Sequence, residues 1–580
     1  MLFRSNMKSY IAATTVAFLL TATTALAANA EQKELEPKAV QTATVDSTNA
    51  TVQEAGTTKK RIYPLHLDKN DYTLDTMKYQ GESVAFRSYE HNVYVQYPVD
   101  ETYQSMNIYV PEGYYEGKTI HGFTAETAPI FLPNTIGGYM PGKAGEPLEK
   151  DDRTGGPNAI LAALAHGYVV AAPGARGRTN VDANGTYTGK APACIVDMKA
   201  AVRYLRYNKD VIPGDMDKIV TNGTSAGGAV SALMGATGNN KDYEPYLRAS
   251  GAAEERDDVF ASSVYCPITD LEHADMAYEW MFSHVHKYYG HQNIAPMTGT
   301  LTVGSETVAL GPGPVIADPH STDENNKNMI VMNRPDNAPI EGKEAVNLTE
   351  QQVYLSQKLK KAFSGYVNDL KLVDENQKKL KLNKKGDGTF KEYIASLYKA
   401  SAQAAIDKGE DLSNVDWVHV QNRHVTGVDL AAYANDVTRL KGVPAFDDLG
   451  LESGENEEFG TAKIKSRHFT DIGEKFSTVH VKGQADSHVI AMMNPLHYIG
   501  KKGTTTARYW RIRHGSTDRD TTLAVPAILA LKLKQDGCHV DFAVPWNQGH
   551  GGDYDVDELF AWIDRIAGPQ TDNGKTKTLK

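Results

Sequence analysis

The stretch Gly223-Thr-Ser225-Ala-Gly227 places a serine between two glycines, and the residues on either side of it decide the fold. Residues 217–222 before it predict a short strand, and residues 226–234 after it, rich in Ala and Gly, predict a helix. Glycines at both ends let such a strand and helix approach closely, while the turn between them holds the serine in a strained backbone. We therefore predict Ser225 as a catalytic nucleophile.

A serine nucleophile needs a general base, and two histidines near the end of the chain are candidates. His539 opens the strand-like run 539–545, where a structural role is expected. His550 lies in the loop that follows, beside Gly551-Gly552, which suits an imidazole that must turn back toward the serine. We predict His550 as the base.

The acid that orients the histidine should come from the loop after the predicted strand 509–513. That loop contains both Asp518 and Asp520, and from the residues alone either could reach the histidine. With either choice the chain order is serine, aspartate, histidine, which is the order in α/β-hydrolases. The three fragments together predict a serine esterase.

A tetrahedral oxyanion requires two N–H donors. One is expected from Ala226, next to the nucleophile at the helix start, and the other from a loop after an early core strand. The run 129–133 is followed by residues 134–140, which contain Gly137-Gly138. We select Gly138 as the second donor.

The remaining strand signals favour a mostly parallel sheet. Strand-like runs precede and follow the serine, and residues 195–205 have apolar positions at helical spacing between two of them. The runs are 105–110, 128–132, 167–172, 217–222 and 262–267. We predict an α/β fold whose core comprises residues 61–272 and 498–570.

The interval between Ser225 and Asp518 spans 293 positions, whereas one crossover needs roughly 30 residues. We therefore expect residues 273–497 to form an inserted lid domain, placed between the nucleophile half and the acid and histidine half. Residues 350–364 and 390–406 in it have helical periodicity. Residues 571–580 are expected to be a tail.

Composition excludes several classes of function. The chain has 580 residues, a formal net charge of -11 and scattered Lys and Arg, which argues against nucleic acid as a partner. Its three cysteines cannot all pair within one chain, and they imply neither a disulfide scaffold nor a cysteine-rich metal site. No metal or organic cofactor is needed for the predicted chemistry, and the oligomeric state is not predicted.

The N-terminus has the pattern of an export signal. Arg4 and Lys8 precede the apolar run 11–20, and small residues offer cleavage after Ala27 or, almost as well, after Ala30. We predict a signal peptide over residues 1–27, a flexible linker over 28–60 and a secreted enzyme. No second apolar segment is long enough to retain the protein in a membrane.

With these motifs in place, the chain from about residue 94 to 568 resembles the bacterial tannases, serine esterases that hydrolyse galloyl esters. The resemblance rests on residues 134–139, 195–201, 221–228, 272–280, 443–447, 510–515 and 552–555. It implies the triad Ser225, Asp518 and His550, so it selects Asp518 over Asp520. It also implies Gly138 and Ala226 as oxyanion donors.

The resemblance further implies a pocket for the galloyl ring. Lys441, Glu455 and Asp520 match positions that hold the phenolic hydroxyls, and Ile268 matches an apolar position against the ring. Carboxylates accept hydrogen bonds from phenols, and an ammonium donates to them. The expected substrates are small galloyl esters such as tannins and alkyl gallates. The alternatives are a feruloyl or general carboxylic esterase and, outside enzymes, a binding protein on a hydrolase scaffold.

Overall fold

The computed structural model describes residues 61–151, 155–288, 345–480 and 483–568, together with the backbone of 299–303 and 306–310. The predicted signal peptide, linker and tail lie outside these residues. No helix in the described part of the chain is long and apolar enough to cross a membrane.

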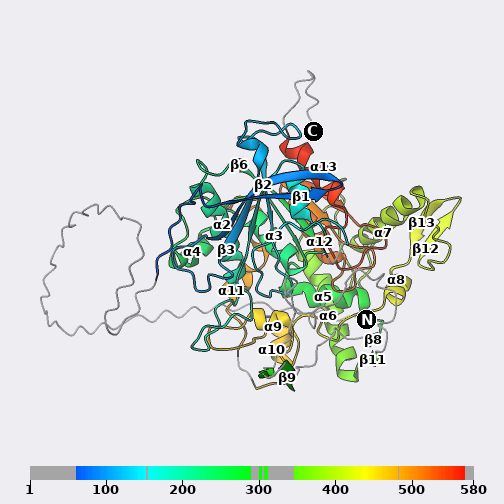
Figure 1. Ribbon diagram of the computed structural model, residues 1–580. Coiled ribbons are helices and arrows are strands. Elements are labelled where there is room, and N and C mark those ends of the chain that lie inside the picture. The colour runs from blue at the N-terminus through cyan, green and yellow to red at the C-terminus, as the bar shows by residue number, and fades with distance from the viewer. Residues whose placement is uncertain are drawn as a thin grey trace, which may run out of the picture. The chain divides into compact units, whose positions relative to one another are not determined.

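A nine-stranded mixed sheet forms the centre of the fold (Figure 1). Its spatial order is β1-β2-β3-β5-β4-β6-β7-β14-β15. The strands are β1 (Thr73–Tyr79), β2 (Glu82–Val93), β3 (Ser105–Pro111), β4 (Pro129–Pro133), β5 (Val169–Pro173), β6 (Asp215–Thr224), β7 (Ala261–Tyr265), β14 (Tyr509–Arg513) and β15 (His539–Ala543). The first three pair antiparallel, and the strands from β5 to β15 all run parallel.

The inner parallel strands are largely buried because helices pack on the sheet, whereas the edge strand β15 is only partly buried. Helix α3 (Ala226–Ala236) lies against β6 and β7, and α12 (Ala524–Gln535) lies against β14 and β15. The other helices of this region are α1 (Ala159–Ala165), α2 (Ala193–Tyr207), α4 (Glu244–Ser250) and α13 (Val556–Ala567). Strands β4, β5 and β7 are apolar or small along most of their length, as expected for strands that face helices.

The predicted strands and helices agree with these elements to within a few residues. Strand β14 has the predicted bounds, and helix α2 covers the predicted positions 195–205. Strands β1 and β2 were not predicted. Strand β1 is an edge strand with no fully buried residue, so its sequence lacks the apolar signal of a core strand.

The long interval after β7 adds no strand to the central sheet in the described residues. It contains α5 (Leu271–Phe282), α6 (Glu350–Asp369), α7 (Thr389–Asp407), α8 (Leu430–Val437), α9 (Gly454–Glu458), α10 (Asp471–Lys475) and α11 (Ser487–Met492). Three short strand pairs accompany them: β8 (Lys287–Tyr288) with β11 (Val346–Asn347), β9 (Gly299–Val303) with β10 (Glu306–Leu310), and β12 (Val418–Gln421) with β13 (His424–Val428). Lys60–Lys580 form one compact unit, so the domain boundaries at residues 273 and 497 stay a prediction.

Candidate active site

The strand-to-helix turn after β6 holds Ser225 in a conformation that serine rarely adopts. Its φ is 59° and its ψ is -123°, and its N–H donates to the carbonyl of Tyr265 on the next strand at 3.0 Å. A Cβ on Gly223 would lie 2.3 Å from the carbonyl oxygen of Gly227, and one on Gly227 would lie 2.4 Å from Asn134 Oδ1. Both glycines are therefore required by close approach, and the turn presents the serine at the carboxyl edge of the sheet.

Three residues from three strand ends form a continuous hydrogen-bonded chain. His550 Nε2 lies 2.8 Å from Ser225 Oγ, and His550 Nδ1 lies 2.9 Å from Asp518 Oδ2. The second oxygen of Asp518 accepts the N–H of Asp520 at 2.9 Å, which fixes the carboxylate. This is the geometry in which a histidine accepts the serine proton while an aspartate holds its tautomer.

The acid loop and the histidine loop are joined to each other. Thr517 donates to the Gln548 carbonyl through its N–H at 3.0 Å and its hydroxyl at 2.9 Å, and Ser516 N–H donates to the Pro545 carbonyl. A Cβ on Gly552 would lie 1.9 Å from Thr224 Oγ1, beside the nucleophile. Because Gly552 has no side chain, the histidine loop packs closely against Thr224, which brings His550 within reach of Ser225.

The protonation of the triad is set by burial and charge. Burial raises the pKa of Asp518, but His550 and His514 together lower it below its usual value, so the carboxylate stays ionised. Burial lowers the pKa of His550, but its neighbours Cys266, Asp518 and Asp520 together raise it well above its usual value. His514 lies 3.5 Å from Asp518, and burial lowers its pKa, which keeps this second histidine neutral.

The loop after β4 brings Gly138 to the same edge of the sheet. Asn134 anchors this loop, because its side-chain amide donates to the carbonyls of Asn222 at 3.0 Å and Gly227 at 3.2 Å. Gly138 has a φ of 54°, and no backbone acceptor among the described residues takes the N–H of Gly138 or of Ala226. The N–H of Ala226, directly after the nucleophile, and the N–H of Gly138, in the anchored loop at the same edge of the sheet, are thus two peptide donors of the kind that an oxyanion needs.

A buried ion pair lies next to the triad. Lys441 Nζ donates to Asp520 Oδ1 at 2.9 Å, and the same oxygen lies 3.9 Å from His550 Nε2. Both members are nearly inaccessible, at 4% and 6% exposed. Burial lowers the pKa of Lys441, but Asp520 and Glu455 raise it above its usual value, so the ammonium stays charged. The structure therefore separates the two aspartates: Asp518 faces the imidazole and Asp520 faces Lys441.

Glu455 and Ile268 come from two other elements. Glu455 lies in the short helix α9, partly buried, and burial raises its pKa while Lys441 opposes that shift. Ile268 is 5% exposed and lies in the loop between β7 and α5. One charged group is thus formed by Lys441, Glu455 and Asp520. Ile268 does not belong to this group, and its position is set by the loop that carries it.

Helix α5 and Arg439 fix the backbone that carries Lys441. Arg439 is fully buried, pairs with Glu279 of α5 at 2.5 Å and donates through Nε to the Lys441 carbonyl at 2.9 Å. The phenolic oxygen of Tyr278 accepts the N–H of Lys441 at 3.2 Å. The lysine is therefore held by α5, which directly follows the strand and loop beside the nucleophile.

The sequence analysis did not identify Arg178, which joins the loop that carries Gly138 to helix α9. Arg178 Nε donates to the Gly138 carbonyl at 2.8 Å, and its Nη1 forms an ion pair with Glu457 of α9. Arg178 is 4% exposed and Glu457 is 5% exposed. The only signal in the sequence is an arginine in the glycine-containing loop after β5, at the carboxyl edge of the sheet, where α/β folds bind their ligands.

A second serine, histidine and aspartate chain occurs away from the elbow. His468 Nε2 lies 2.9 Å from Ser477 Oγ, and His468 Nδ1 lies 2.7 Å from Asp447 Oδ1. The Ser477 hydroxyl donates to the Val479 carbonyl at 3.0 Å, so its proton is not directed at the histidine. Asp447 also accepts the Asn456 amide at 2.7 Å, which ties this chain to α9. We interpret it as structural.

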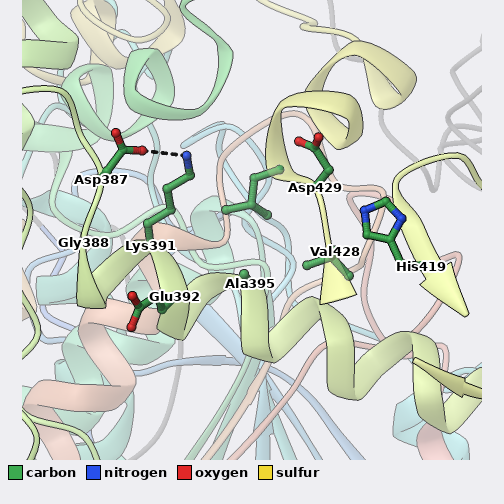
Figure 2. Close-up of a pocket in the computed structure, with 9 residues that line it drawn as sticks. Asp387, Gly388, Lys391, Glu392, Ala395, His419, Val428 and Asp429 are labelled. Carbon is green, nitrogen blue, oxygen red and sulfur yellow. Dashed lines mark hydrogen bonds and ion pairs between the residues drawn. The ribbon is translucent and has the colours of Figure 1, made fainter. Parts of the chain in front are cut away.

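A separate open cavity of about 490 Å³ lies among residues 387–430. Figure 2 shows the side chains that line it. Lys391 pairs with Asp387 at 2.8 Å, and the Asp429 side chain accepts two N–H groups at the start of α8. The lining residues are Asp387, Gly388, Lys391, Glu392, Ala395, His419, Val428, Asp429 and Leu430. None belongs to the predicted site, and the Lys391, Asp387 and Asp429 charges are satisfied locally, so we assign the cavity no role in catalysis.

Comparison with known proteins decides the family. A family model described as BD-FAE matches residues 145–299. The tannase of Fusobacterium nucleatum is 45% identical in its crystal structure, with a TM-score of 0.77, covering 87% of this chain and 100% of that one. The chain belongs to the bacterial tannase family. The tannin acyl hydrolase of Lactobacillus plantarum is 40% identical with a TM-score of 0.75, covering 87% of this chain and 99% of that one.

The family confirms the α/β-hydrolase fold and the assignment as a carboxylic ester hydrolase. A curated relative, Esterase LipC of Mycobacterium tuberculosis, is 43% identical over 56 residues, which are 10% of this chain and 14% of that esterase. One solved structure of a tannin acyl hydrolase is a complex with ethyl gallate. In this tannase-family chain the bonded triad, the two peptide donors and the Lys441 group share one edge of the sheet.

Proposed function

We propose that the protein hydrolyses galloyl esters to gallic acid and an alcohol through a galloyl-enzyme on Ser225. The observation that carries the proposal is the buried Lys441–Asp520 pair beside the catalytic histidine. Similarity to a tannin acyl hydrolase solved with ethyl gallate supports the same substrate class.

The first half-reaction uses the bonded chain of the triad. His550 Nε2 takes the proton of Ser225 Oγ as that oxygen attacks the ester carbonyl, and Asp518 keeps the imidazole oriented. The N–H groups of Gly138 and Ala226 are directed to the carbonyl oxygen as it becomes negative. His550 then returns the proton to the departing alkoxide, and the alcohol leaves.

The second half-reaction repeats these steps with water. His550 removes a proton from water, the hydroxide attacks the galloyl carbonyl, and the proton passes to Ser225 Oγ as gallic acid leaves. The chemistry uses only side chains and peptide groups of this chain.

The charged group supplies the specificity for the acyl ring. Glu455 and Asp520 accept hydrogen bonds from phenolic hydroxyls, while Lys441 donates to them. An ester whose ring lacks these hydroxyls leaves the carboxylates desolvated and unpaired, which lowers transition-state binding. The alcohol side contributes less, because the three charged residues all concern the ring.

The experiment is to follow gallic acid release from methyl gallate by the wild-type protein and two variants. Ser225→Ala should abolish turnover and labelling by a fluorophosphonate, with an unchanged circular dichroism spectrum. Ser477→Ala is the matched control, since it removes a serine that also lies against a histidine, and it should retain both turnover and labelling. Turnover by Ser225→Ala, or its loss in Ser477→Ala, would reject the assignment of the nucleophile.

We also propose that the enzyme is exported, with residues 1–27 removed. The charged start, the short apolar run and the small residues at Ala25 and Ala27 support this. Expression of the full chain in a secreting host, followed by N-terminal sequencing of the product in the medium, tests it. A new N-terminus at Ala28 or Glu31 is expected, and retention of uncleaved chain inside the cells would contradict export.

A further inference from the structure

A cysteine lies beside the catalytic histidine, although the hydrolytic steps do not use it. Cys266 directly follows β7, is 1% exposed, and its Sγ donates to the carbonyl of Gly551 at 3.4 Å. The thiol is thus packed against the loop that carries His550. Its own N–H donates to the Arg513 carbonyl at 2.7 Å on the neighbouring strand, so the backbone that carries it is held in place.

Three different metal-binding side chains converge at this point. Cys266 Sγ, a carboxylate oxygen of Asp518 and a ring nitrogen of His550 all lie within 4.8 Å of one another. In the part of the chain that the structure describes, this is the one group of three His, Cys, Asp or Glu residues that comes so close together. Thiolate, imidazole and carboxylate are the ligands that Zn²⁺ prefers.

The dimensions of the group suit a small cation. Zn²⁺ bonds of about 2.0–2.3 Å in tetrahedral geometry separate ligand atoms by roughly 3.3–3.6 Å. The three donor atoms lie within 4.8 Å of one another, so the farthest pair needs to close by at most about 1.2–1.5 Å, a change that small side-chain rotations supply. Solvent would supply the fourth ligand.

We infer that Cys266, His550 and Asp518 form an inhibitory binding site for Zn²⁺. On binding, the Cys266 thiol loses one proton to solvent and an S–Zn bond forms, while the imidazole and the carboxylate donate their lone pairs. The site thus adds to the esterase a sensitivity to thiophilic divalent cations.

Inhibition follows whichever ring nitrogen binds the metal. Coordination through Nε2 replaces the 2.8 Å hydrogen bond to Ser225, so the base is lost. Coordination through Nδ1 replaces the 2.9 Å hydrogen bond to Asp518 and moves the ring proton to Nε2, so this nitrogen can no longer accept the Ser225 proton. In both cases Zn²⁺ competes with turnover at the same residues. The inhibition acts on the triad alone and is therefore expected with any ester that the enzyme hydrolyses.

The other two cysteines provide matched controls. Cys194 is buried against Glu458, with Sγ 3.8 Å from Oε1, and Cys538 is partly buried. Neither belongs to a group of three ligands among the described residues. Serine at position 266 keeps nearly the same size and can still donate to Gly551, so Cys266→Ser should retain basal activity.

The test titrates the full mature protein with zinc chloride while ester hydrolysis is followed. Wild type, Cys194→Ser and Cys538→Ser should lose activity together and regain it with a chelator, whereas Cys266→Ser should require a Zn²⁺ concentration at least about 10-fold higher. Equal inhibition of wild type and Cys266→Ser would overturn the site.

A second measurement does not depend on activity. Titration with cadmium chloride should give thiolate-to-metal absorbance that saturates at one metal per chain in wild type and in Ser225→Ala, and it should be lost in Cys266→Ser. Absence of this absorbance in wild type, or its persistence in Cys266→Ser, would overturn the inference even if gallate hydrolysis is established. Conversely, one bound metal that requires Cys266 would support the site even if gallate esters proved poor substrates.

Discussion

Replacement of Arg178 tests whether the position of Gly138, in the loop of residues 134–140, depends on helix α9, which carries Glu455. The guanidinium donates to the Gly138 carbonyl at 2.8 Å and pairs with Glu457 of α9, and the Arg178 N–H donates to the Tyr139 carbonyl at 2.8 Å. In Arg178→Met the first two contacts are lost, while the backbone contact remains.

The stability cost comes from Glu457, which is left buried. Removing one partner of a buried ion pair costs about 3–5 kcal/mol. Lys190 Nζ lies 3.8 Å from the other oxygen of Glu457 and compensates part of its charge, so we expect the free energy of unfolding to fall by about 3 kcal/mol. A protein of this size should tolerate that loss and stay folded at 25 °C.

The catalytic cost comes from Gly138. Deleting an oxyanion donor costs about 2.7–4 kcal/mol of transition-state stabilisation. Arg178→Met keeps the Gly138 N–H but removes the contact that fixes its position, so the cost should be smaller. We therefore expect kcat to fall by about 10- to 100-fold, which corresponds to about 1.4–2.7 kcal/mol, with little change in KM.

Steady-state kinetics with methyl gallate and urea unfolding measure the two effects. Glu457→Gln is the matched control, because it weakens the ion pair but leaves the Arg178 Nε contact with Gly138. It should lose stability while keeping most of kcat. A folded Arg178→Met protein with wild-type kcat, or one whose loss lies wholly in KM, would refute the reasoning.

The remaining predictions concern charge. Asp518→Asn should chiefly lower kcat, whereas Asp520→Asn should chiefly raise KM for methyl gallate; a reversal of the two patterns would exchange their roles. Because Asp520 raises the pKa of His550, Asp520→Asn should also shift the acid limb of kcat/KM to lower pH, and an unchanged limb would contradict that influence. Burial raises the pKa of Glu458 from an ordinary 4.5 to about 8. The protonated side chain therefore contributes its full stability below about pH 4.5, and this contribution is lost as pH rises through 8. The loss in the free energy of unfolding is at most about 5 kcal/mol. Between about pH 5 and pH 8 the Tm of Glu458→Gln should therefore fall less than the Tm of wild type, and parallel plots of Tm against pH would contradict this.

The elbow could be predicted from sequence because its physics is local. The two glycines, the strand and the small-residue helix all lie within one short stretch, and the close contacts of Gly223 and Gly227 require those residues. His550 could be selected because few histidines follow the acid and one sits between a strand end and two glycines.

The choice between Asp518 and Asp520 could not be made from local sequence. The two lie two positions apart in one loop, and their roles are set by which partner each side chain meets, His550 or Lys441. Those partners come from elsewhere in the chain, so only the family resemblance indicated the assignment.

Burial explains why the residues that we propose to bind the ring cannot be identified by pattern analysis. No motif marks Lys441 in the sequence, yet contacts with α5 and the acid loop enclose it. Arg178 has no periodic signal at all, and its role emerges only when α9 folds against the loop after β5. Such long-range pairing of charged side chains has no counterpart in hydrophobic periodicity.

The central claim is that the triad acts on an acyl ring selected by its hydroxyls, and side-by-side kcat/KM values for methyl gallate and methyl ferulate test it most directly. The methoxy group of ferulate brings an acceptor and a methyl group toward carboxylates that expect a donor. We predict at least about 10²-fold preference for methyl gallate, within the roughly 10⁴-fold that such a site can reach. Comparable values for the two esters would contradict galloyl recognition by Lys441, Glu455 and Asp520, while leaving the serine esterase chemistry intact.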